Sequence, residues 1–415
     1  MKAVILAVGD ELTAGATVDT NSAFLSRRLA EHGIATLRHL TVGDDTGAIA
    51  RALAEAAAEA GLVVVSGGLG PTADDLTRHA LAEATGAELV EDARSAERIA
   101  AFFALRGRQM KPSNRRQALA PAGAEMIDND CGTAPGIAAR IGRAEVFALP
   151  GPPHEMVAMF EARVLPRLRG DGAIARRELH TFGTGESDVA AEIADLMARD
   201  ANPTVGTTAK AGVITVRIAA TAPTAEAAEA LADGTAAEVR RRLGELVFGA
   251  GEETMASVVG ALLDAAGRTA AAAESCTGGL VSEMITGVPG ASRYFRGGVV
   301  AYANAAKTDL LGVPAERIAA AGAVSEPVAE ALAAGAARRF GADYGLSLTG
   351  IAGPAGGSDD KPVGLVYIGL ASPAGTAVHR HVFPGTRDVI RRRAALAALN
   401  HLRLALAHPQ GPPRQ

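Results

Sequence analysis

A run of small and polar residues at positions 273–279 has the composition of a catalytic turn. It reads Ala-Glu-Ser-Cys-Thr-Gly-Gly, follows an apolar strand-like segment and opens a helix-like one. Small residues at the start of a helix leave backbone N–H groups free at its positive end, where they can bind an anion or a developing oxyanion. Ser275 therefore stands where a nucleophile would, and Thr277, Gly278 and Gly279 are candidates to hold its substrate.

Two other interpretations of this run stay open. Thr277 could be an ordinary helix N-cap, followed by two glycines that only allow close packing. Cys276 could replace Ser275 as the nucleophile, although no neighbouring His or Arg in the sequence would lower the pKa of its thiol.

A serine hydroxyl needs a base, and a second segment offers two candidates. Tyr302 closes a predicted strand, and Lys307 follows little more than one helical turn later. A desolvated lysine amine or a tyrosinate can take the serine proton. None of the nine histidines lies between His180 and His379, so a Ser-His-Asp triad is not expected here. The alternative for Lys307 is an exposed first helical turn, where its amine would stay charged.

A third segment combines a strand end with a glycine-rich loop at residues 349–357. Thr349, Gly350 and Gly353 belong to it, and such a loop can cradle a phosphate or an oxyanion through backbone N–H groups. Taken alone, it is more often a mobile surface loop. Arg387 and Arg391, near the start of the last predicted helix, are candidates to pair with a substrate phosphate.

The N-terminal part of the chain carries a second constellation, in which glycines stand beside acids. The candidate nucleotide-binding residues are Asp10, Glu11, Asp19, Asn21, Gly67, Gly68 and Gly70. Glycines let a phosphate approach the backbone, and Asp74 and Asp75 could hold a hard divalent cation such as Mg²⁺ beside it. The alternative is that these two aspartates only cap the following helix.

All these segments lie at the junctions of a predicted α/β chain. Strands at 3–8, 36–42, 62–66 and 145–149 alternate with helices at 21–32 and 46–60, which predicts a parallel sheet with helices on both faces. Ligands of such sheets bind where strands hand over to helices.

The rest of the chain predicts two further domains. A small α+β module is expected from strands at 177–182, 204–209 and 213–220 and helices at 187–197 and 225–243. A second α/β domain is expected from strands at 269–273, 299–302, 344–348, 363–370 and 377–383 and helices at 254–266, 279–285, 305–311, 328–340 and 386–406. The predicted domains are 1–169, 170–250 and 251–408, followed by a tail at 409–415.

The composition limits the class of protein. A chain of 415 residues exceeds one ordinary core of roughly 100–150 residues, and 48% hydrophobic with 21% charged residues is typical of soluble globular proteins. The net charge of −5 disfavours nucleic acid as the main partner. Two cysteines give no disulfide framework, and no signal peptide or membrane span is visible, so a cytoplasmic location without membrane contact is expected.

The three C-terminal segments together resemble the nicotinamide mononucleotide (NMN) deamidase domain of the CinA, or competence/damage-inducible, family. The stretches A-E-S-C-T-G-G, G-V-V-A-Y-A-N-A-A-K and L-T-G-I-A-G-P occur in the family's order between about residues 254 and 406. The resemblance implies a cofactor-independent serine amidohydrolase that converts NMN to nicotinate mononucleotide and ammonia. By position, Ser275 is the nucleophile and Tyr302 and Lys307 activate it. Ala355 departs from the family's glycine run and would be strained if its φ were positive.

The N-terminal domain resembles the molybdopterin-binding fold at the start of full-length CinA proteins. The matching stretches are G-G-L-G-P-T-A-D-D, N-R-R-Q with Asn114 and Gln117, G-T-A-P-G and L-P-G-P-P. The resemblance implies a divalent-metal-dependent ADP-ribose pyrophosphatase, and the middle module resembles the family's KH-type domain, here without an RNA role.

Two rival functions follow from the same resemblance. One is a pterin-binding or adenylyl-transfer module, and the other is a competence or DNA-repair accessory that acts by binding. The base rates of oligomers favour a homodimer.

Overall fold

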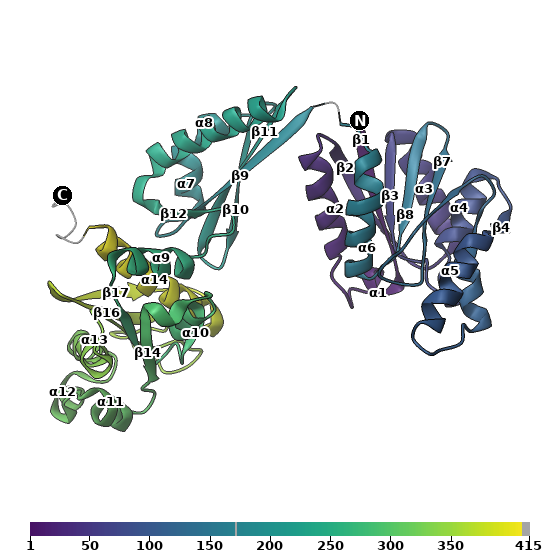
Figure 1. The fold of residues 1–415 in the computed structure, drawn as a ribbon. Helices are drawn as coiled ribbons and strands as arrows, with labels where there is room; N and C mark the ends of the chain where they lie inside the picture. Colours follow the sequence, from purple (N-terminus) through teal and green to yellow (C-terminus); the bar gives the residue numbers. More distant parts are fainter. Residues whose placement is uncertain (171, 409–415) are drawn as a thin grey trace. The chain divides into compact units, whose positions relative to one another are not determined.

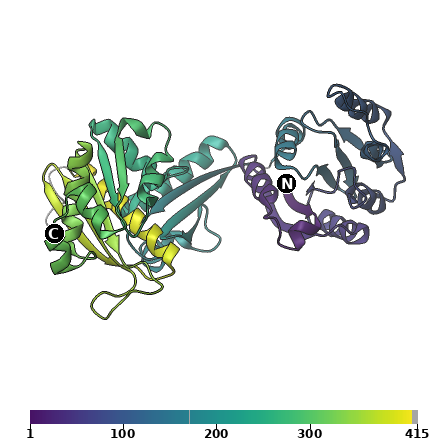
Figure 2. The ribbon, with the colours of Figure 1, turned by 90° about the horizontal axis from the view of Figure 1, so that it is seen from below.

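The computed structural model describes residues 1–170 and 172–408, so the predicted tail at 409–415 lies outside the described residues. The chain divides into two compact units. The first comprises Met1–Arg176 with Ala219–Ala232, and the second comprises Arg177–Ile218 with the described residues from Asp233 onward. The sheet of the first unit is flanked by helices in both views of the ribbon (Figures 1 and 2).

The N-terminal domain is built on a mixed sheet in the order β2-β1-β3-β8-β7-β6. Its strands are β1 (Lys2–Val8), β2 (Ala35–Val42), β3 (Leu62–Ser66), β6 (Glu125–Ile127), β7 (Gly136–Ile141) and β8 (Ala144–Leu149). Its helices are α1 (Asp10–Thr13), α2 (Thr20–Glu31), α3 (Thr46–Glu59), α4 (Thr77–Thr85), α5 (Ala93–Ala104) and α6 (Pro153–Met159), with a 3-10 segment at Pro112–Ala118 and a separate strand pair β4 (Leu89–Glu91) and β5 (Leu119–Pro121). The strands β2, β1, β3 and β8 are parallel, as predicted, whereas β7 and β6 add an antiparallel edge.

Two hydrophobic layers hold this sheet between its helices. On one face, Ile49 and Leu53 of α3 pack with Leu81 of α4. On the other, Leu29 of α2 packs with Phe160, which follows α6. Both faces of the central strands are therefore buried, which is the reason their sequences are continuous apolar runs.

The middle module is a four-stranded sheet in the order β10-β11-β9-β12. Its elements are β9 (Ala173–Thr181), α7 (Glu186–Glu192), β10 (Thr204–Lys210), β11 (Val213–Ala222), α8 (Ala225–Leu243) and β12 (Val247–Ala250), with 3-10 segments at Ala194–Met197 and Gly244–Leu246. Buried and less buried residues alternate along β11, as expected for a strand with one covered face.

The C-terminal domain has a five-stranded sheet in the order β14-β13-β15-β16-β17. Its strands are β13 (Ala270–Glu274), β14 (Phe295–Val300), β15 (Tyr344–Gly350), β16 (Leu365–Ser372) and β17 (Gly375–Val382). Its helices are α9 (Met255–Ala266), α10 (Leu280–Thr286), α11 (Asn304–Leu311), α12 (Ala315–Ala321), α13 (Glu326–Phe340) and α14 (Arg387–Ala407), with a 3-10 segment at Ala291–Arg293. The strands β14, β13 and β15 are parallel, and β16 and β17 continue the sheet antiparallel.

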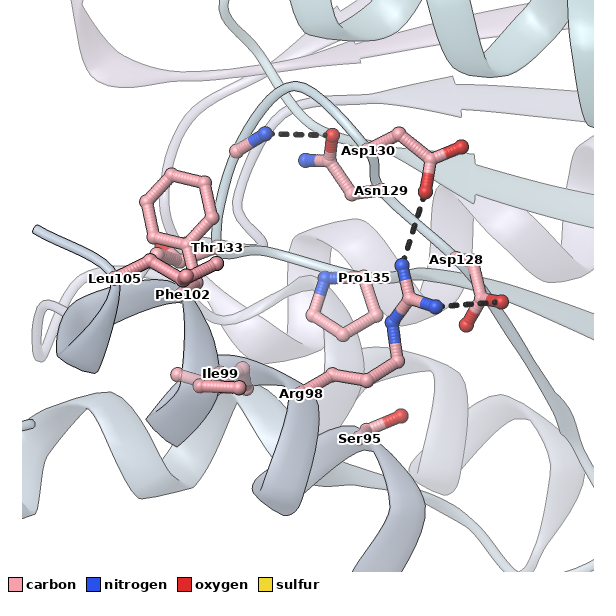
Figure 3. Close-up of a pocket in the computed structure, with 12 residues that line it drawn as sticks. Ser95, Arg98, Ile99, Phe102, Leu105, Asp128, Asn129, Asp130, Thr133 and Pro135 are labelled. Atoms are coloured by element: carbon pink, nitrogen blue, oxygen red, sulfur yellow. Dashed lines mark hydrogen bonds and ion pairs between the residues drawn. The ribbon is translucent and has the colours of Figure 1, made fainter.

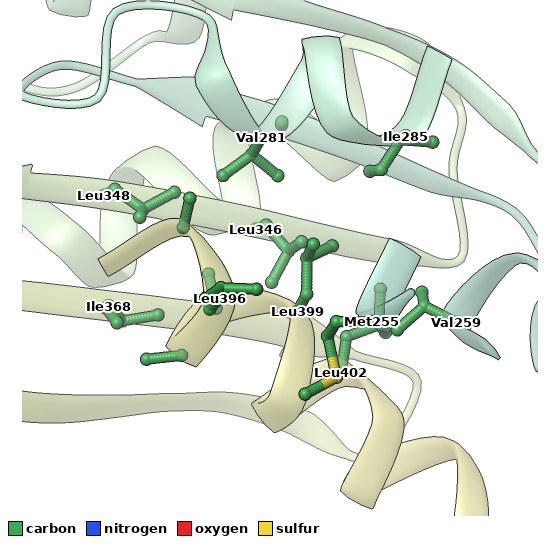
Figure 4. Packing of buried hydrophobic residues seen from close by; sticks show 14 of the residues in the cluster. Met255, Val259, Val281, Ile285, Leu346, Leu348, Ile368, Leu396, Leu399 and Leu402 are labelled. Atoms are coloured by element: carbon green, nitrogen blue, oxygen red, sulfur yellow. The ribbon is translucent and has the colours of Figure 1, made fainter. Parts of the chain in front are cut away.

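The strand β13 lies between β14 and β15 and consists of four alanines and a glutamate, all buried. Ala270 and Ala272 face the cluster of α9, α10 and α14, shown in part in Figure 4, and Ala271 and Ala273 face the cluster that includes α13. The first cluster also contains Phe182 and Phe248 of the middle module. The C-terminal core therefore extends into the module that precedes it.

None of the helices within residues 1–170 and 172–408 combines the length and the apolar character needed to cross a bilayer.

Candidate active site

The turn that carries Ser275 is anchored on a buried carboxylate, that of Glu274. This side chain is 0% exposed at the end of β13. Its Oε2 accepts hydrogen bonds from the backbone N–H groups of Gly279 (3.1 Å) and Val281 (3.0 Å), and its Oε1 accepts from the N–H and the hydroxyl of Ser282 (both 2.8 Å). The carboxylate thus accepts hydrogen bonds from the free N–H donors at the start of α10, and its negative charge interacts favourably with the positive end of the helix dipole.

The backbone of this serine turn (residues 275–279) is fixed on both sides. The N–H of Ser275 donates to Leu348 O on the neighbouring strand (2.9 Å), and Gly278 N–H donates back to Ser275 O (3.2 Å). Gly278 and Gly279 have φ of 62° and 97°, a region where a side chain would be strained. Gly279 is the N-cap of α10, so the interpretation of Thr277 as that cap is wrong.

Cys276 and Thr277 point into the protein rather than toward solvent. Burial raises the pKa of the Cys276 thiol to about 12, so it stays protonated at neutral pH and is a poor rival nucleophile. Thr277 is 0% exposed, and within the described part of the chain its hydroxyl has no hydrogen-bond partner. Ser275 is only half-buried, so its hydroxyl is the more accessible candidate nucleophile of this turn.

Lys307 is buried, and the alternative of a solvated helix face is wrong. Lys307 is 1% exposed, and its Nζ donates to Ala301 O (2.9 Å) and Tyr302 O (3.0 Å). Burial lowers the pKa of Lys307, and the nearby Cys276 opposes that shift. A neutral amine has two N–H bonds and one lone pair, so the two carbonyls can occupy both donors and leave the lone pair to accept a proton.

Tyr302 lies two residues beyond the end of β14, which stops at Val300 rather than at Tyr302 as predicted. Tyr302 is 62% exposed, and its hydroxyl accepts a hydrogen bond from Arg387 Nη2 (3.3 Å). Lys307 therefore contacts the backbone of Tyr302, not its phenol. In the described structure no hydrogen bond joins the Ser275 hydroxyl to Tyr302 or Lys307.

Two arginines in the first turns of α14 bring the three predicted segments together. Arg387 Nη1 donates to Gly353 O (2.8 Å) while its other terminal nitrogen reaches Tyr302. Arg391 Nη2 donates to Thr277 O in the serine turn (2.7 Å). Each guanidinium keeps further N–H donors, so both remain suited to an anionic substrate group.

The glycine-rich loop after β15 is only partly placed as predicted. Thr349 is 1% exposed and donates its hydroxyl to Ala323 O (2.7 Å), so the expectation that it binds substrate is not supported by its geometry. Gly350 is still a strand residue, where a Cβ would lie 2.6 Å from Leu365 O. Ala355 is absent from the residues with positive φ, so the expected strain does not arise.

Glu274→Gln should weaken the C-terminal domain, because the amide group would turn an N–H toward donors that need an acceptor. We expect a loss of about 1–3 kcal/mol in the free energy of unfolding. Tyrosine fluorescence during urea unfolding can measure it, since the chain has no Trp and four tyrosines. All of them belong to this domain: Tyr294, Tyr302, Tyr344 and Tyr367. The control is Glu283→Gln, an exposed acid of α10; equal unfolding curves for both variants would contradict the role of Glu274.

Three histidines gather at the opposite edge of the same sheet. The rings of His379 and His401 stack with centroids 3.8 Å and planes 7° apart, and Nε2 of His381 lies 3.0 Å from Nε2 of His401. Stacked rings hold their lone pairs in parallel planes, so the trio cannot converge on one metal ion. Burial lowers the pKa of all three, that of His401 to about 3, helped by the charges of the other two.

These histidines predict a pH-dependent stability. The unfolded chain binds protons below pH ~6.5 while the folded trio stays neutral, so the free energy of unfolding should fall as pH drops from about 6.5 toward about 3. His401→Asn should flatten this fall in urea titrations read by tyrosine fluorescence. His154→Asn, an exposed control, should not; an unchanged slope in His401→Asn would show that the trio does not titrate this way.

The N-terminal domain contains a cavity of about 590 Å³ at the end of β1 and β3. The glycine loop (residues 67–75) forms part of its wall, and at Gly67 a Cβ would lie 2.2 Å from Val8 O, so only glycine lets the two strand ends meet. Five carboxylates line the cavity: Glu11, Asp44, Asp74, Asp75 and Glu155.

The predicted metal pair of Asp74 and Asp75 is not a preformed ligand set. The carboxylate of Asp75 accepts from the N–H groups of Gly70 and Thr72 (both 2.7 Å) and from the Thr72 hydroxyl, so it closes the loop instead. Asp74 is exposed. Within residues 1–170 and 172–408, no three His, Cys, Asp or Glu side chains are grouped to hold a metal ion.

Among the acids that line the cavity, Asp44 has a raised pKa. Burial, together with the negative charges of Asp10, Glu11 and Asp74, raises the pKa of Asp44, against a hydrogen bond from the Asp10 backbone. Concentrated negative charge of this kind attracts a cation. Oxygen ligands of the type that Mg²⁺ prefers are therefore present, and water or phosphate oxygens would have to complete its shell.

The remaining predicted residues of this domain are mainly structural. The backbone N–H groups of Asp10 and Asp44 each donate to the carboxylate of the other (3.0 Å each), and Asp19 is the N-cap of α2, accepting from Ser22 N (2.9 Å). Asn21 ties Ser66 Oγ to Gly151 O (2.8 Å each). Asn114 is buried, its amide contacts Gln117 Oε1 (3.4 Å), and Gln117 rather than Asn114 lines the cavity.

Sequence reasoning missed Arg78, which holds the glycine loop from behind. It is 1% exposed and donates to Leu69 O (2.6 Å) and Gly70 O (3.0 Å), and burial lowers its pKa to about 10. Arg116 adds a hydrogen bond to Thr72 O (3.0 Å). The sequence signal for a buried Arg78 was its place one helical turn before the apolar residues Leu81 and Ala82.

The fold and the two sites define a multidomain α/β protein with a molybdopterin-binding-like N-terminal domain. Three family models match the chain: "Probable molybdopterin binding domain" at residues 4–170, "Damage-inducible protein CinA KH domain" at 176–249 and "CinA C-terminal domain" at 252–406. A CinA-like protein of Geobacter metallireducens is 45% identical over 410 residues, 98% of this chain and 99% of that protein. A CinA-like protein of Anaeromyxobacter sp. is 47% identical over 404 residues, 97% of this chain and 98% of that one. The chain belongs to the CinA family.

Solved structures of the family match parts of the chain. The competence/damage inducible protein CihA from Agrobacterium tumefaciens is 38% identical, covers 37% of this chain and 93% of its own, and has a TM-score of 0.36. The protein CinA from Thermoplasma acidophilum is 36% identical, covers 39% and 96%, and has a TM-score of 0.37.

Proposed function

We propose that the C-terminal domain hydrolyses the carboxamide of nicotinamide mononucleotide to nicotinate mononucleotide and ammonia. The observation that carries this proposal is the convergence of an accessible serine, a buried lysine and two arginines at one end of the sheet. The arginines suit the phosphate of a mononucleotide, whereas the N–H groups of Gly278 and Gly279 are already bound to Ser275 O and to Glu274 and are not free for an oxyanion.

In the proposed reaction, the Ser275 hydroxyl oxygen attacks the carboxamide carbon while its proton passes to the neutral amine of Lys307. The oxyanion then collapses and the C–N bond breaks, and the nitrogen leaves as ammonia with the proton from Lys307. Water hydrolyses the resulting ester by the same route, which releases the carboxylate and restores Ser275.

Tyr302 is assigned a supporting role. Its exposed ring lies beside the carbonyl that orients Lys307, and its hydroxyl is held by Arg387. It can therefore contact the substrate ring and link the phosphate-binding arginine to the catalytic segment. Cys276 remains a buried thiol and takes no proton.

Ser275→Ala should lower the rate of ammonia release from NMN by several orders of magnitude, because the acyl acceptor is lost. Cys276→Ala, a neighbour in the same turn, is the matched control and should keep most of the rate. Retention of activity in Ser275→Ala together with its loss in Cys276→Ala would show that the thiol is the nucleophile.

Lys307→Arg should lose most of kcat with KM little changed, because a guanidinium keeps the charge but does not deprotonate. In the wild type, kcat should rise with pH through the lowered pKa of Lys307, since the base acts when neutral. The control is Lys361→Arg, whose lysine also donates to a backbone carbonyl, that of Ala321 (3.0 Å). Near wild-type turnover in both Lys307→Arg and Lys307→Ala would refute the base assignment.

We further propose that the N-terminal cavity cleaves the pyrophosphate of ADP-ribose. Glycine-loop N–H groups can hold the phosphates, and Glu11, Asp44 and Asp74 offer oxygen ligands to a divalent cation beside them. When bound, such a cation neutralises pyrophosphate charge. Arg78 and Asp75 keep the loop in shape for this contact.

Cleavage of ADP-ribose should be abolished by EDTA and reduced by Asp74→Asn, while ammonia release from NMN continues. Product chromatography measures the first reaction and an ammonia assay the second. Glu97→Gln, an exposed acid of α5, is the control for loss of charge. Metal-independent cleavage, or loss of both activities in Asp74→Asn, would contradict a separate metal-dependent site.

A further inference from the structure

A second pocket, of about 250 Å³, lies between α5 and residues 128–135 of the N-terminal domain (Figure 3). Its walls are largely apolar, and the apolar side chains are Ile99, Ala101, Phe102, Leu105 and Pro135. Ile99 is 2% exposed whereas Leu105 is 86% exposed, so the pocket has a buried floor and an open rim. A shape of this kind accepts a flat apolar group with a polar edge.

The charges in this pocket are already paired. Arg98 donates to Asp128 Oδ2 (3.2 Å) and to Asp130 Oδ1 (3.0 Å). Arg94 also reaches Asp128 and Arg163 also reaches Asp130 (2.8 and 2.9 Å). Each of these three guanidinium groups is already paired with at least one of the two carboxylates, so the pocket offers a ring its apolar wall rather than an unpaired cation.

The pocket lies next to the glycine-loop cavity. Thr133 lines both. Asn129, which lines the pocket, donates to Oε2 of Glu155, which lines the cavity (2.6 Å). A Cβ on Gly132 would lie 2.0 Å from the same carboxylate oxygen. The Asn129–Glu155 contact and Gly132 close the partition between the two hollows, so a ligand with its phosphates in the cavity and a ring in the pocket passes by way of Thr133.

Another side of the cavity differs in chemistry. A smaller pocket of about 120 Å³ shares Glu11 and Thr17 with the cavity and is lined by Asn21, Asp19 and Ser66. Within the described residues, Oδ1 of Asn21 is buried without a hydrogen-bond partner. Hydroxyl groups suit this side, so the ring belongs on the α5 side.

We propose that the α5 pocket binds the aromatic base of a nucleoside diphosphate whose phosphates occupy the glycine-loop cavity. The base packs against Phe102, and its polar edge meets the hydroxyl of Thr133, because the amide of Asn129 already has all its hydrogen bonds within the protein. This inference rests on the proposed nucleotide function of the N-terminal domain and adds the part of the ligand that the domain recognises.

The test compares ligands with and without a base by calorimetry on the full chain in Mg²⁺ buffer. Phe102→Ala should weaken binding of ADP-ribose and AMP about tenfold, in the range of base-aromatic stacking, and leave inorganic pyrophosphate and ribose 5-phosphate unchanged. Phe103→Ala is the matched control, because Phe103 is the next residue of α5 and is not part of the pocket wall. Leu105→Asp, at an exposed position, should weaken the same two ligands without risk to the fold.

Each other outcome is decisive. Unchanged ADP-ribose and AMP affinity in Phe102→Ala and Leu105→Asp would overturn the base pocket while leaving the nucleotide function intact. Equal weakening of pyrophosphate in Phe102→Ala would mean that the pocket acts only through the fold. If the wild type binds none of the four ligands, the nucleotide function fails and the base pocket fails with it.

Discussion

The C-terminal site depends on one buried carboxylate. Glu274 accepts four hydrogen bonds at the start of α10, and these bonds fix the path from the serine turn into the helix. A charge with 0% exposure is tolerated only where donors surround it. The position of Ser275 relative to Lys307, Arg387 and Arg391 follows from this constraint.

The N-terminal domain meets a similar demand with the opposite charge. Its glycine loop is held by the buried guanidinium of Arg78 from behind and closed by Asp75 from within. In both domains a strand is followed by a turn of small residues, and the backbone of this turn must keep one conformation beside the proposed ligand. A buried or half-buried charge that is saturated with backbone partners provides that rigidity.

Local pattern in the sequence was sufficient for most elements. The predicted helix at 225–243 and strand at 62–66 coincide with α8 and β3, because side-chain periodicity is a local property. The antiparallel edges β7-β6 and β16-β17 were not predicted, since strand pairing depends on distant partners. The homodimer, the cytoplasmic location and the absence of an RNA role stay predictions.

The site was predicted in its residues more than in its contacts. The motifs located Ser275 and Lys307, but nothing local shows that Lys307 binds two backbone carbonyls. Thr349 was predicted to bind substrate, but side chains alternate between the two faces of β15. The Thr349 hydroxyl lies on the face that contacts Ala323 O. Glu274 belongs to the most informative motif of the sequence. Its burial depends on the helix that covers it, which the motif alone does not show.

The most direct measurement is the identity of the covalent intermediate. Acid quenching of the protein during NMN turnover, followed by peptide mass spectrometry, should show a nicotinoyl mononucleotide ester on Ser275, and the adduct should be absent in Ser275→Ala. An adduct on Cys276, or rapid turnover with no adduct on the peptide that contains Ser275, would contradict the serine mechanism.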